Sequence, residues 1–168
     1  TKAIAQLKGP VYLRFGRPKM PVFMPEDIPF EIGKAIGLTE GSDITIVATG
    51  HLVWKALKAS EVLKEKGISA EVINIHTIKP LDEKAILDSV RKTGCVVTAE
   101  EHQRNGGLGE AVAQTLVRHY PAPLEMVAVN DTFGESGSPE DLLVKYGLDT
   151  PNVIAAAEKV LQRKSVVV

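Results

Sequence analysis

The stretch from residue 44 to residue 80 constrains the fold of this chain most strongly. Residues 44–48 (Ile-Thr-Ile-Val-Ala) are short, β-branched and almost entirely apolar, which is typical of a strand buried on both faces. Residues 51–66 place apolar side chains at helical spacing, and Gly67 follows where a helix should end. Residues 70–75 form a second apolar run. These runs predict one βαβ unit with parallel strands and a right-handed crossover.

The alternation of strand and helix continues along the chain. Apolar runs that predict strands begin near residues 44, 70, 95 and 124, an even spacing that is typical of repeated βα units. Helix caps and apolar periodicity predict helices over residues 82–93, 108–120, 138–146 and 150–163. A short strand is expected at residues 34–38 and a polar loop at 100–107. The predicted fold class is α/β: a three-layer α/β/α sandwich with a mostly parallel sheet of about five strands.

Residues 1–17 are predicted to be the remnant of a preceding domain. The chain has no initiator Met, and Ala3, Ile4 and Leu7 predict the last two turns of a helix whose beginning is missing. Residues 11–15 predict a strand. We therefore expect a processed chain or a fragment of a longer one. Residues 18–29 are rich in proline and predict an extended linker, and residues 30–168 form the main domain.

Composition excludes several classes of function. The chain has 168 residues and a net charge of −1, which predicts no nucleic-acid partner. One cysteine, Cys95, begins an apolar strand, so we interpret it as a buried structural thiol and not a catalytic one. Apolar runs stay below the ~18 residues that span a bilayer. A cytoplasmic setting without a membrane partner is therefore expected.

A glycine-rich stretch, residues 106–109 (Gly-Gly-Leu-Gly), lies between a predicted strand and a predicted helix. Free N–H groups at such a position can bind phosphate. The dinucleotide pattern is broken, because Val112 stands where its third glycine belongs. Close packing of the helix on the sheet is the favoured interpretation, and nucleotide binding is the alternative.

Histidines and acids give weaker candidates. The chain has four histidines, none spaced with another for a metal site: His51, His76, His102 and His119. Residues 100–102 (Glu-Glu-His) lie at the carboxyl end of a predicted strand, where open α/β sheets place ligands. For this cluster and for His51, a solvated or interface role is favoured over a metal or acid–base site.

Three cations lie close together before the linker: Arg14, Arg17 and Lys19. Two arginines beside a Gly-Pro turn can bind a phosphate bidentately. Charge alone favours the alternative, ordinary surface charge on a linker.

Four stretches together match a known family: residues 9–17, residues 70–82, residues 98–102 with 106–109, and residues 132–137 with 145–148. On these stretches the chain resembles the C-terminal part of transketolase. It is more distantly similar to deoxyxylulose-phosphate synthase and to the β subunits of 2-oxo-acid dehydrogenases. The resemblance implies that residues 1–17 end the family's pyrimidine-binding domain and that residues 30–168 form its C-terminal domain.

The resemblance also implies a cofactor that this chain cannot bind alone. The intact enzyme would use thiamine diphosphate and Mg²⁺. The Gly-Asp-Gly…Asn motif that holds them, and the glutamate that activates thiamine, do not occur here. No catalytic residue, cofactor ligand or metal ligand is therefore expected in this chain.

One substrate contact is carried over from the family. Transketolases bind the sugar phosphate with an arginine just before the linker, in a Ser-Arg-x-x-x-Pro stretch. Residues 16–21 (Gly-Arg-Pro-Lys-Met-Pro) match it. The resemblance thus implies that Arg17 binds the substrate phosphate, with weaker support for Arg14. It also implies that the C-terminal domain mainly serves dimer contacts.

The expected activity belongs to the intact protein, which would move a two-carbon ketol unit between phosphosugars as a homodimer completed by an N-terminal part. This chain alone is expected to be inactive. Deoxyxylulose-phosphate synthase and a dehydrogenase β subunit are alternatives, although residues 133–136 (Phe-Gly-Glu-Ser) argue against both. A non-catalytic dimerisation or docking module is an alternative of another class.

Overall fold

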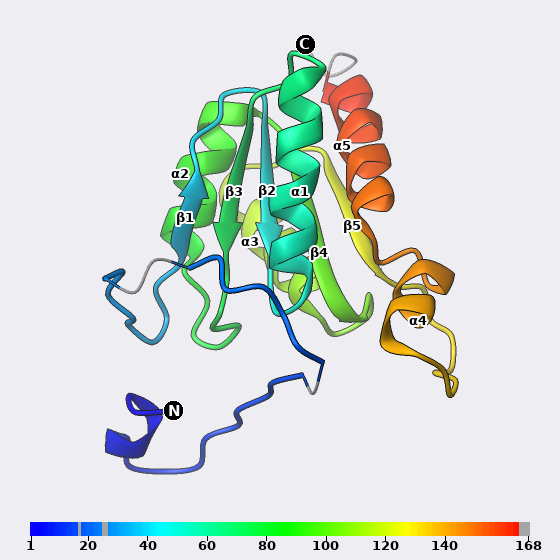
Figure 1. Cartoon of the computed structure of the whole chain (residues 1–168). Helices are drawn as coiled ribbons and strands as arrows, with labels where there is room; N and C mark the ends of the chain where they lie inside the picture. Colours follow the sequence, from blue (N-terminus) through cyan, green and yellow to red (C-terminus); the bar gives the residue numbers. More distant parts are fainter. Residues whose placement is uncertain (17, 25–26, 165–168) are drawn as a thin grey trace.

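A five-stranded sheet forms the centre of the molecule in the computed structural model, which describes residues 1–16, 18–24 and 27–164. The strand order is β1-β3-β2-β4-β5 (Figure 1). The strands are β1 (Ile36–Thr39), β2 (Ile44–Ala48), β3 (Ala70–Asn74), β4 (Val96–Gln103) and β5 (Leu124–Val129). Strands β2 to β5 pair in parallel, whereas β1 pairs antiparallel with β3. The predicted mostly parallel sheet of five strands is confirmed.

Helices cover both faces of this sheet (Figure 1). Helices α1 (Leu52–Glu65) and α5 (Thr150–Lys164) pack on one face. Helices α2 (Glu83–Thr93) and α3 (Leu108–His119) pack on the other. The short α4 (Pro139–Lys145) lies between β5 and α5. The three-layer α/β/α architecture is therefore confirmed as well.

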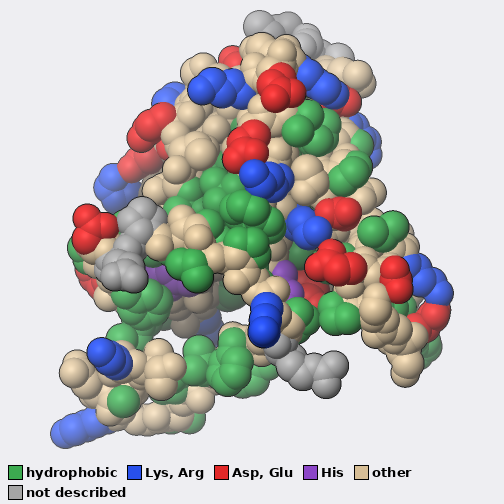
Figure 2. Space-filling model, in the orientation of Figure 1, with side chains coloured by type: hydrophobic (Ala, Val, Ile, Leu, Met, Phe, Trp, Pro, Cys, Tyr) green, Lys and Arg blue, Asp and Glu red, His purple; other side chains and the backbone are tan. Residues whose placement is uncertain are grey.

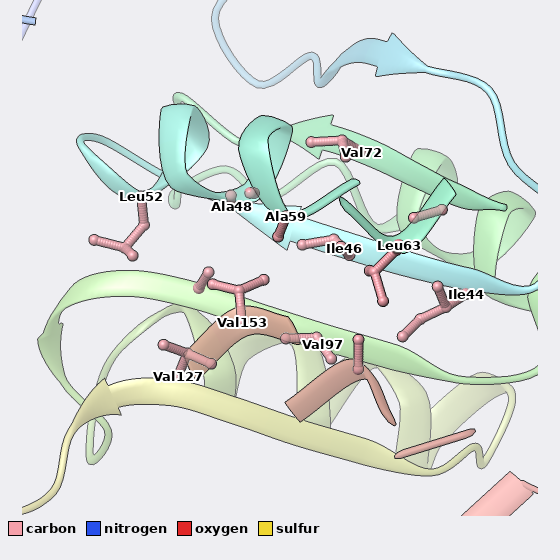
Figure 3. Packing of buried hydrophobic residues seen from close by; sticks show 14 of the residues in the cluster. Ile44, Ile46, Ala48, Leu52, Ala59, Leu63, Val72, Val97, Val127 and Val153 are labelled. Atoms are coloured by element: carbon pink, nitrogen blue, oxygen red, sulfur yellow. The ribbon is translucent and has the colours of Figure 1, made fainter. Parts of the chain in front are cut away.

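Strand β2 shows why its sequence is apolar throughout. All five of its residues are buried. Ile44 and Ile46 pack against α1 and α5 (Figure 3), and Val47 packs against α2 and α3. A central strand with helices on both faces has no solvent-facing side, so its one hydroxyl, on Thr45, is bonded to Ser89 and Thr93 of α2.

The predicted helix ends agree with the structure. The Asp82 side chain accepts a hydrogen bond from the Ala85 N–H and caps α2, and Gly94 ends it at φ 74°. Ser138 caps α4 in the same way by accepting from the Asp141 N–H. Each cap satisfies a backbone donor that the first helical turn leaves free.

The N-terminal segment differs from its prediction. The expected helix end is a single 3₁₀ turn, η1 (Ile4–Gln6), and residues 11–15 form no strand. A strand needs a neighbour to accept its hydrogen bonds, and the described residues supply none there. The segment instead shows hydrophobic side chains below the body of the molecule (Figure 2). Its exposed hydrophobic residues include Leu7, Tyr12 and Phe15.

The strand expected at residues 95–99 is longer than predicted. β4 continues through Glu100, Glu101 and His102, which were expected in a loop, and Gln103 pairs with Val129 of β5 after a register shift. The polar residues remain in the strand because β5 offers backbone partners as far as Val129, where Arg104 N–H donates to its carbonyl. The first strand is likewise shifted, from residues 34–38 to Ile36–Thr39.

Within the described ranges, no helix is both long and apolar enough to cross a membrane.

Candidate functional site

The candidate site lies where the loops after β2 and β4 meet. These strands are neighbours in the sheet, but β2 leads through α1 to β3 on one side, and β4 leads through α3 to β5 on the other. Helices α1 and α3 also cover opposite faces. Doubly wound sheets bind ligands in the crevice outside such a reversal of strand order.

His51 and Glu101 form a pair at this reversal of strand order, the position called the crevice below. His51 follows β2 and directly precedes α1, and Glu101 lies in β4. His51 Nδ1 is 3.3 Å from Glu101 Oε2, with the side chains 13% and 37% exposed. A carboxylate at Nδ1 favours the ring tautomer that carries its proton there, which leaves Nε2 facing away from Glu101.

Residues 14–16 lie across this pair. Arg14 Nη2 donates to the backbone carbonyl of Glu101 at 3.2 Å. A Cβ on Gly16 would stand 2.1 Å from His51 Nε2, so the backbone at Gly16 rests against the imidazole ring. Further along, Phe23 stacks on Trp54 of α1 with the ring centroids 5.9 Å apart. The chain's own N-terminal segment thus lies against the His51–Glu101 pair and contacts α1 at Trp54.

Of the two predicted phosphate ligands, the structure places one. Arg14 is exposed at the crevice. Arg17 lies outside the described residues, and its role stays a prediction.

The glycine-rich stretch 106–109 has a packing role. The Glu100 carboxylate is 2% exposed and accepts hydrogen bonds at 2.8 Å from the N–H groups of Leu108 and Gly109. The strand therefore caps helix α3 with its own anion, where a bound phosphate would lie. A Cβ on Gly109 would lie 2.7 Å from Met126 Sδ, and one on Gly107 would lie 2.3 Å from Glu100 Oε2. Close approach of helix and sheet therefore explains these two glycines, whereas Gly106 adopts a positive φ of 77°.

His76 lies at the same edge of the sheet, after β3. Its ring packs against Phe30 with the centroids 4.3 Å apart, and Nδ1 is 2.9 Å from the Thr77 hydroxyl. Burial lowers the pKa of His76 below its ordinary value. His51 and His76 are therefore both held by their surroundings, and they do not contact each other in any described interaction.

The remaining reactive side chains do not form a centre. The described residues contain no group of three His, Cys, Asp or Glu side chains that could hold a metal ion. Burial raises the pKa of the Cys95 thiol, so the structural interpretation of this cysteine fits its environment. His102 is exposed, and His119 lies 3.6 Å from Glu83 on the surface.

An open groove of about 630 Å³ lies beside the glycine-rich stretch. The loop after β3 and the first turns of α3 line it, with Ile78, Lys79 and Glu110 among the lining residues. Sequence reasoning did not identify this groove, because it depends on how that loop lies against α3.

The fold and this site define a doubly wound α/β domain, with residues 14–16 of its own N-terminal segment lying at the strand reversal. The model of the transketolase C-terminal domain matches residues 33–153, and the chain belongs to this family. It is 48% identical over 157 residues to the 6-deoxy-6-sulfo-D-fructose transketolase subunit SqwH of Clostridium sp. (strain MSTE9), covering 94% of this chain and 49% of that protein. It is 37% identical over 168 residues to 1-deoxy-D-xylulose-5-phosphate synthase of Desulforudis audaxviator (strain MP104C), covering 98% of this chain and 26% of that enzyme.

A solved structure described as a split gene transketolase, inactive β4 tetramer, has the same fold. It superposes with a TM-score of 0.93 at 48% identity, covering 97% of this chain and 54% of that one. The chain therefore spans about half the length of the split transketolase relatives and about a quarter of the synthase.

Proposed function

We propose that this chain is the C-terminal half of a thiamine-diphosphate-dependent transketolase, which moves a two-carbon ketol unit between phosphosugars. The observation that carries the proposal is the match of nearly the whole chain to about half of a transketolase subunit at 48% identity. An N-terminal half, on the same chain or on a partner subunit, would complete the enzyme. Relatives named for different sugars leave the sugar itself unassigned.

The described residues do not fit the cofactor. They hold no cluster of side chains suited to Mg²⁺, and the N-terminal end of α3, where a diphosphate could bind, is capped by the buried Glu100. When bound, thiamine diphosphate supplies the carbon nucleophile for ketol transfer. In this proposal that chemistry belongs to the other half of the enzyme.

The contribution of this chain to the substrate is electrostatic. Arg17 would bind the sugar phosphate, supported by Arg14, since a guanidinium matches phosphate geometry with two parallel hydrogen bonds. The position of Arg14 beside Glu101, two residues before the contact at Gly16, supports this assignment. The domain would also contribute to dimer contacts.

Titration and reconstitution test the proposal together. Calorimetric titration of this chain with thiamine diphosphate and Mg²⁺ is expected to give no binding heat. Mixing the chain with its N-terminal half should restore cofactor-dependent ketol transfer between phosphosugars. Saturable binding to this chain alone, or a completed enzyme without ketol transfer, would contradict the proposal.

Substitutions at the linker test the phosphate contact. Arg17→Ala should raise KM for a phosphorylated acceptor about 10- to 100-fold, because a charged hydrogen-bonded pair is lost. Arg17→Lys keeps the charge, and its KM should lie between the values of the wild type and Arg17→Ala. Lys19→Ala is the matched control and should change KM little. An unchanged KM in Arg17→Ala would remove the assignment.

Two other functions have an observation in their favour. The 37% identity to 1-deoxy-D-xylulose-5-phosphate synthase favours that activity as the second candidate, and an assay for 1-deoxy-D-xylulose-5-phosphate in the completed enzyme decides it. The tetrameric neighbour favours a self-associating module. That module would assemble in sedimentation experiments and show no ketol transfer with any N-terminal half.

A further inference from the structure

We propose that His51 and Glu101 are positioning residues, which seat residues 14–16 of the chain's own N-terminal segment at the strand reversal and thereby fix Arg14. The role in catalysis rests on the proposed function. The contact of residues 14–16 with His51 and Glu101, called the seat below, does not. Neither residue would touch the reacting atoms.

The first step is the location of the segment. The crevice between β2 and β4 is where a sheet of this topology offers its loops to a ligand. Here residues 14–16 lie at that place, in contact with Glu101 near the end of β4 and with His51 after β2. Residues 14–16 of the same chain thus occupy the position where a sheet of this topology usually binds a ligand.

The second step is the orientation of the imidazole ring. Glu101 Oε2 lies 3.3 Å from Nδ1 of His51, so one edge of the ring faces the carboxylate at ion-pair distance. The opposite edge, with Nε2, rests against Gly16, where a Cβ would stand at only 2.1 Å. The ring can lie in this orientation only because residue 16 has no side chain.

The third step is the double role of Glu101. Its carboxylate orients His51, and its backbone carbonyl accepts the hydrogen bond from Arg14. One residue of β4 therefore fixes the segment at two points, through Arg14 and through Gly16.

The last step concerns charge. The partner of Arg14 at this point is a neutral carbonyl, and among the described residues Arg14 forms no ion pair with a carboxylate. Its positive charge is therefore held in place without being neutralised. An anion with two or more oxygens, such as a sugar phosphate, is the ligand that such a fixed guanidinium suits.

Nuclear magnetic resonance of the labelled chain tests the seat. The wild type should show an NOE between the His51 ring protons and the Gly16 α-protons, and restrained ¹⁵N relaxation at residues 14–16. Glu101→Ala and Gly16→Ala should both release the segment to fast motion. Glu101→Gln keeps an acceptor for Nδ1–H and should retain the seat. His119→Ala, a surface histidine, is the control.

Absence of the His51–Gly16 NOE in the wild type would overturn the seat. So would segment motion that is as large in the wild type as in Glu101→Ala and Gly16→Ala.

Kinetics of the completed enzyme test the positioning role. Glu101→Ala and Gly16→Ala should raise KM for a phosphorylated acceptor by about 10-fold, as expected for loss of a positioning contact, with kcat and KM for an unphosphorylated acceptor nearly unchanged. Glu101→Gln should keep KM for the phosphorylated acceptor close to the wild-type value. Equal effects on both acceptors, or none, would overturn positioning. A wild type without ketol transfer would instead refute the proposed function, and the resonance data would still decide the seat.

Discussion

Gly107 lies against the carboxylate of Glu100, and a Cβ on Gly107 would stand 2.3 Å from Glu100 Oε2. The Glu100 carboxylate cannot move away from an added Cβ, because two backbone N–H groups of α3 hold it. We expect Gly107→Ala to lower the free energy of unfolding by about 1–3 kcal/mol, the usual cost of overpacking. Urea denaturation measures this. Gly37→Ala, with nothing within 4 Å of the added Cβ, is the control, and equal effects would contradict the contact.

Removing the charge of Glu100 should also destabilise the fold. In Glu100→Gln one of the two oxygens becomes an NH₂ group, which cannot accept from Leu108 or Gly109. A buried donor then loses its partner, at a cost of about 1–3 kcal/mol. Glu110→Gln, at an exposed carboxylate that accepts from Gly106, should stay within about 0.5 kcal/mol. Similar midpoints in urea for both variants would rule out the capping role.

The same cap predicts how the chain responds to nucleotides. The N–H groups at the start of α3 already bond to Glu100, so a phosphate would have to displace a buried carboxylate. We expect no rise in Tm with millimolar ADP, since a ligand that does not bind the native state cannot stabilise it. A concentration-dependent rise would revive the nucleotide-binding alternative.

A lysine on α1 connects two distant parts of the chain. Lys55 Nζ lies 2.9 Å from Asp149 Oδ1, just before α5, and 3.5 Å from Glu140 Oε2 in α4. The hydrogen bond from Lys55 is the main reason that the pKa of Asp149 lies below its ordinary value. The folded state therefore binds fewer protons here than the unfolded state in acid.

This depressed pKa predicts a loss of stability in acid. The contribution of Asp149 is fully present above its unfolded pKa of about 4 and is lost as pH falls through the lower folded value. The difference in unfolding free energy between wild type and Asp149→Asn should therefore shrink between pH 6 and pH 3. Asp88→Asn, in an exposed pair with Lys84, is the control and should show a small difference throughout. A constant gap for Asp149→Asn would contradict the pairing.

Local sequence signals account for most of the fold. The last strand occupies the predicted residues, Leu124–Val129, because its apolar run is bounded by Pro123 and Asn130. The caps at Asp82 and Ser138 work through neighbouring residues, so the sequence alone is enough. The end of β4 depends instead on its register with β5, which lies more than twenty residues away along the chain. No local pattern carries that information.

The candidate site was harder to predict for the same reason. His51 and Glu101 could each be noted as polar residues after a strand, but their contact requires β4 to lie beside β2. Strand spacing alone allows β4 to lie beside β3 instead. The role of Gly16 depends on the same arrangement, since its neighbour is the His51 ring. Arg14 and Arg17 were identified from charge and resemblance, and their function stays a prediction.

His76 gives a pH dependence near neutrality. Its ring is partly buried against Phe30, and burial lowers the pKa of His76. The unfolded state, with a pKa of about 6.5, then binds the proton more readily than the folded state. The stability linked to His76 is fully present above about pH 6.5 and is lost as pH falls toward the folded pKa.

A substitution isolates this effect. His76→Gln does not titrate, so its unfolding free energy should fall less than that of the wild type between pH 7.5 and pH 5.5. His119→Gln, at an exposed histidine on α3, should keep the wild-type slope. The ring resonances of His76 report the titration directly, and a midpoint at or above that of a model histidine would refute the burial argument. Nδ1 is engaged by Thr77, and Nε2 is buried without a hydrogen-bond partner among the described residues. Burial of the ring outweighs the nearby backbone groups that favour its protonated form, which is why acid should weaken this edge of the sheet.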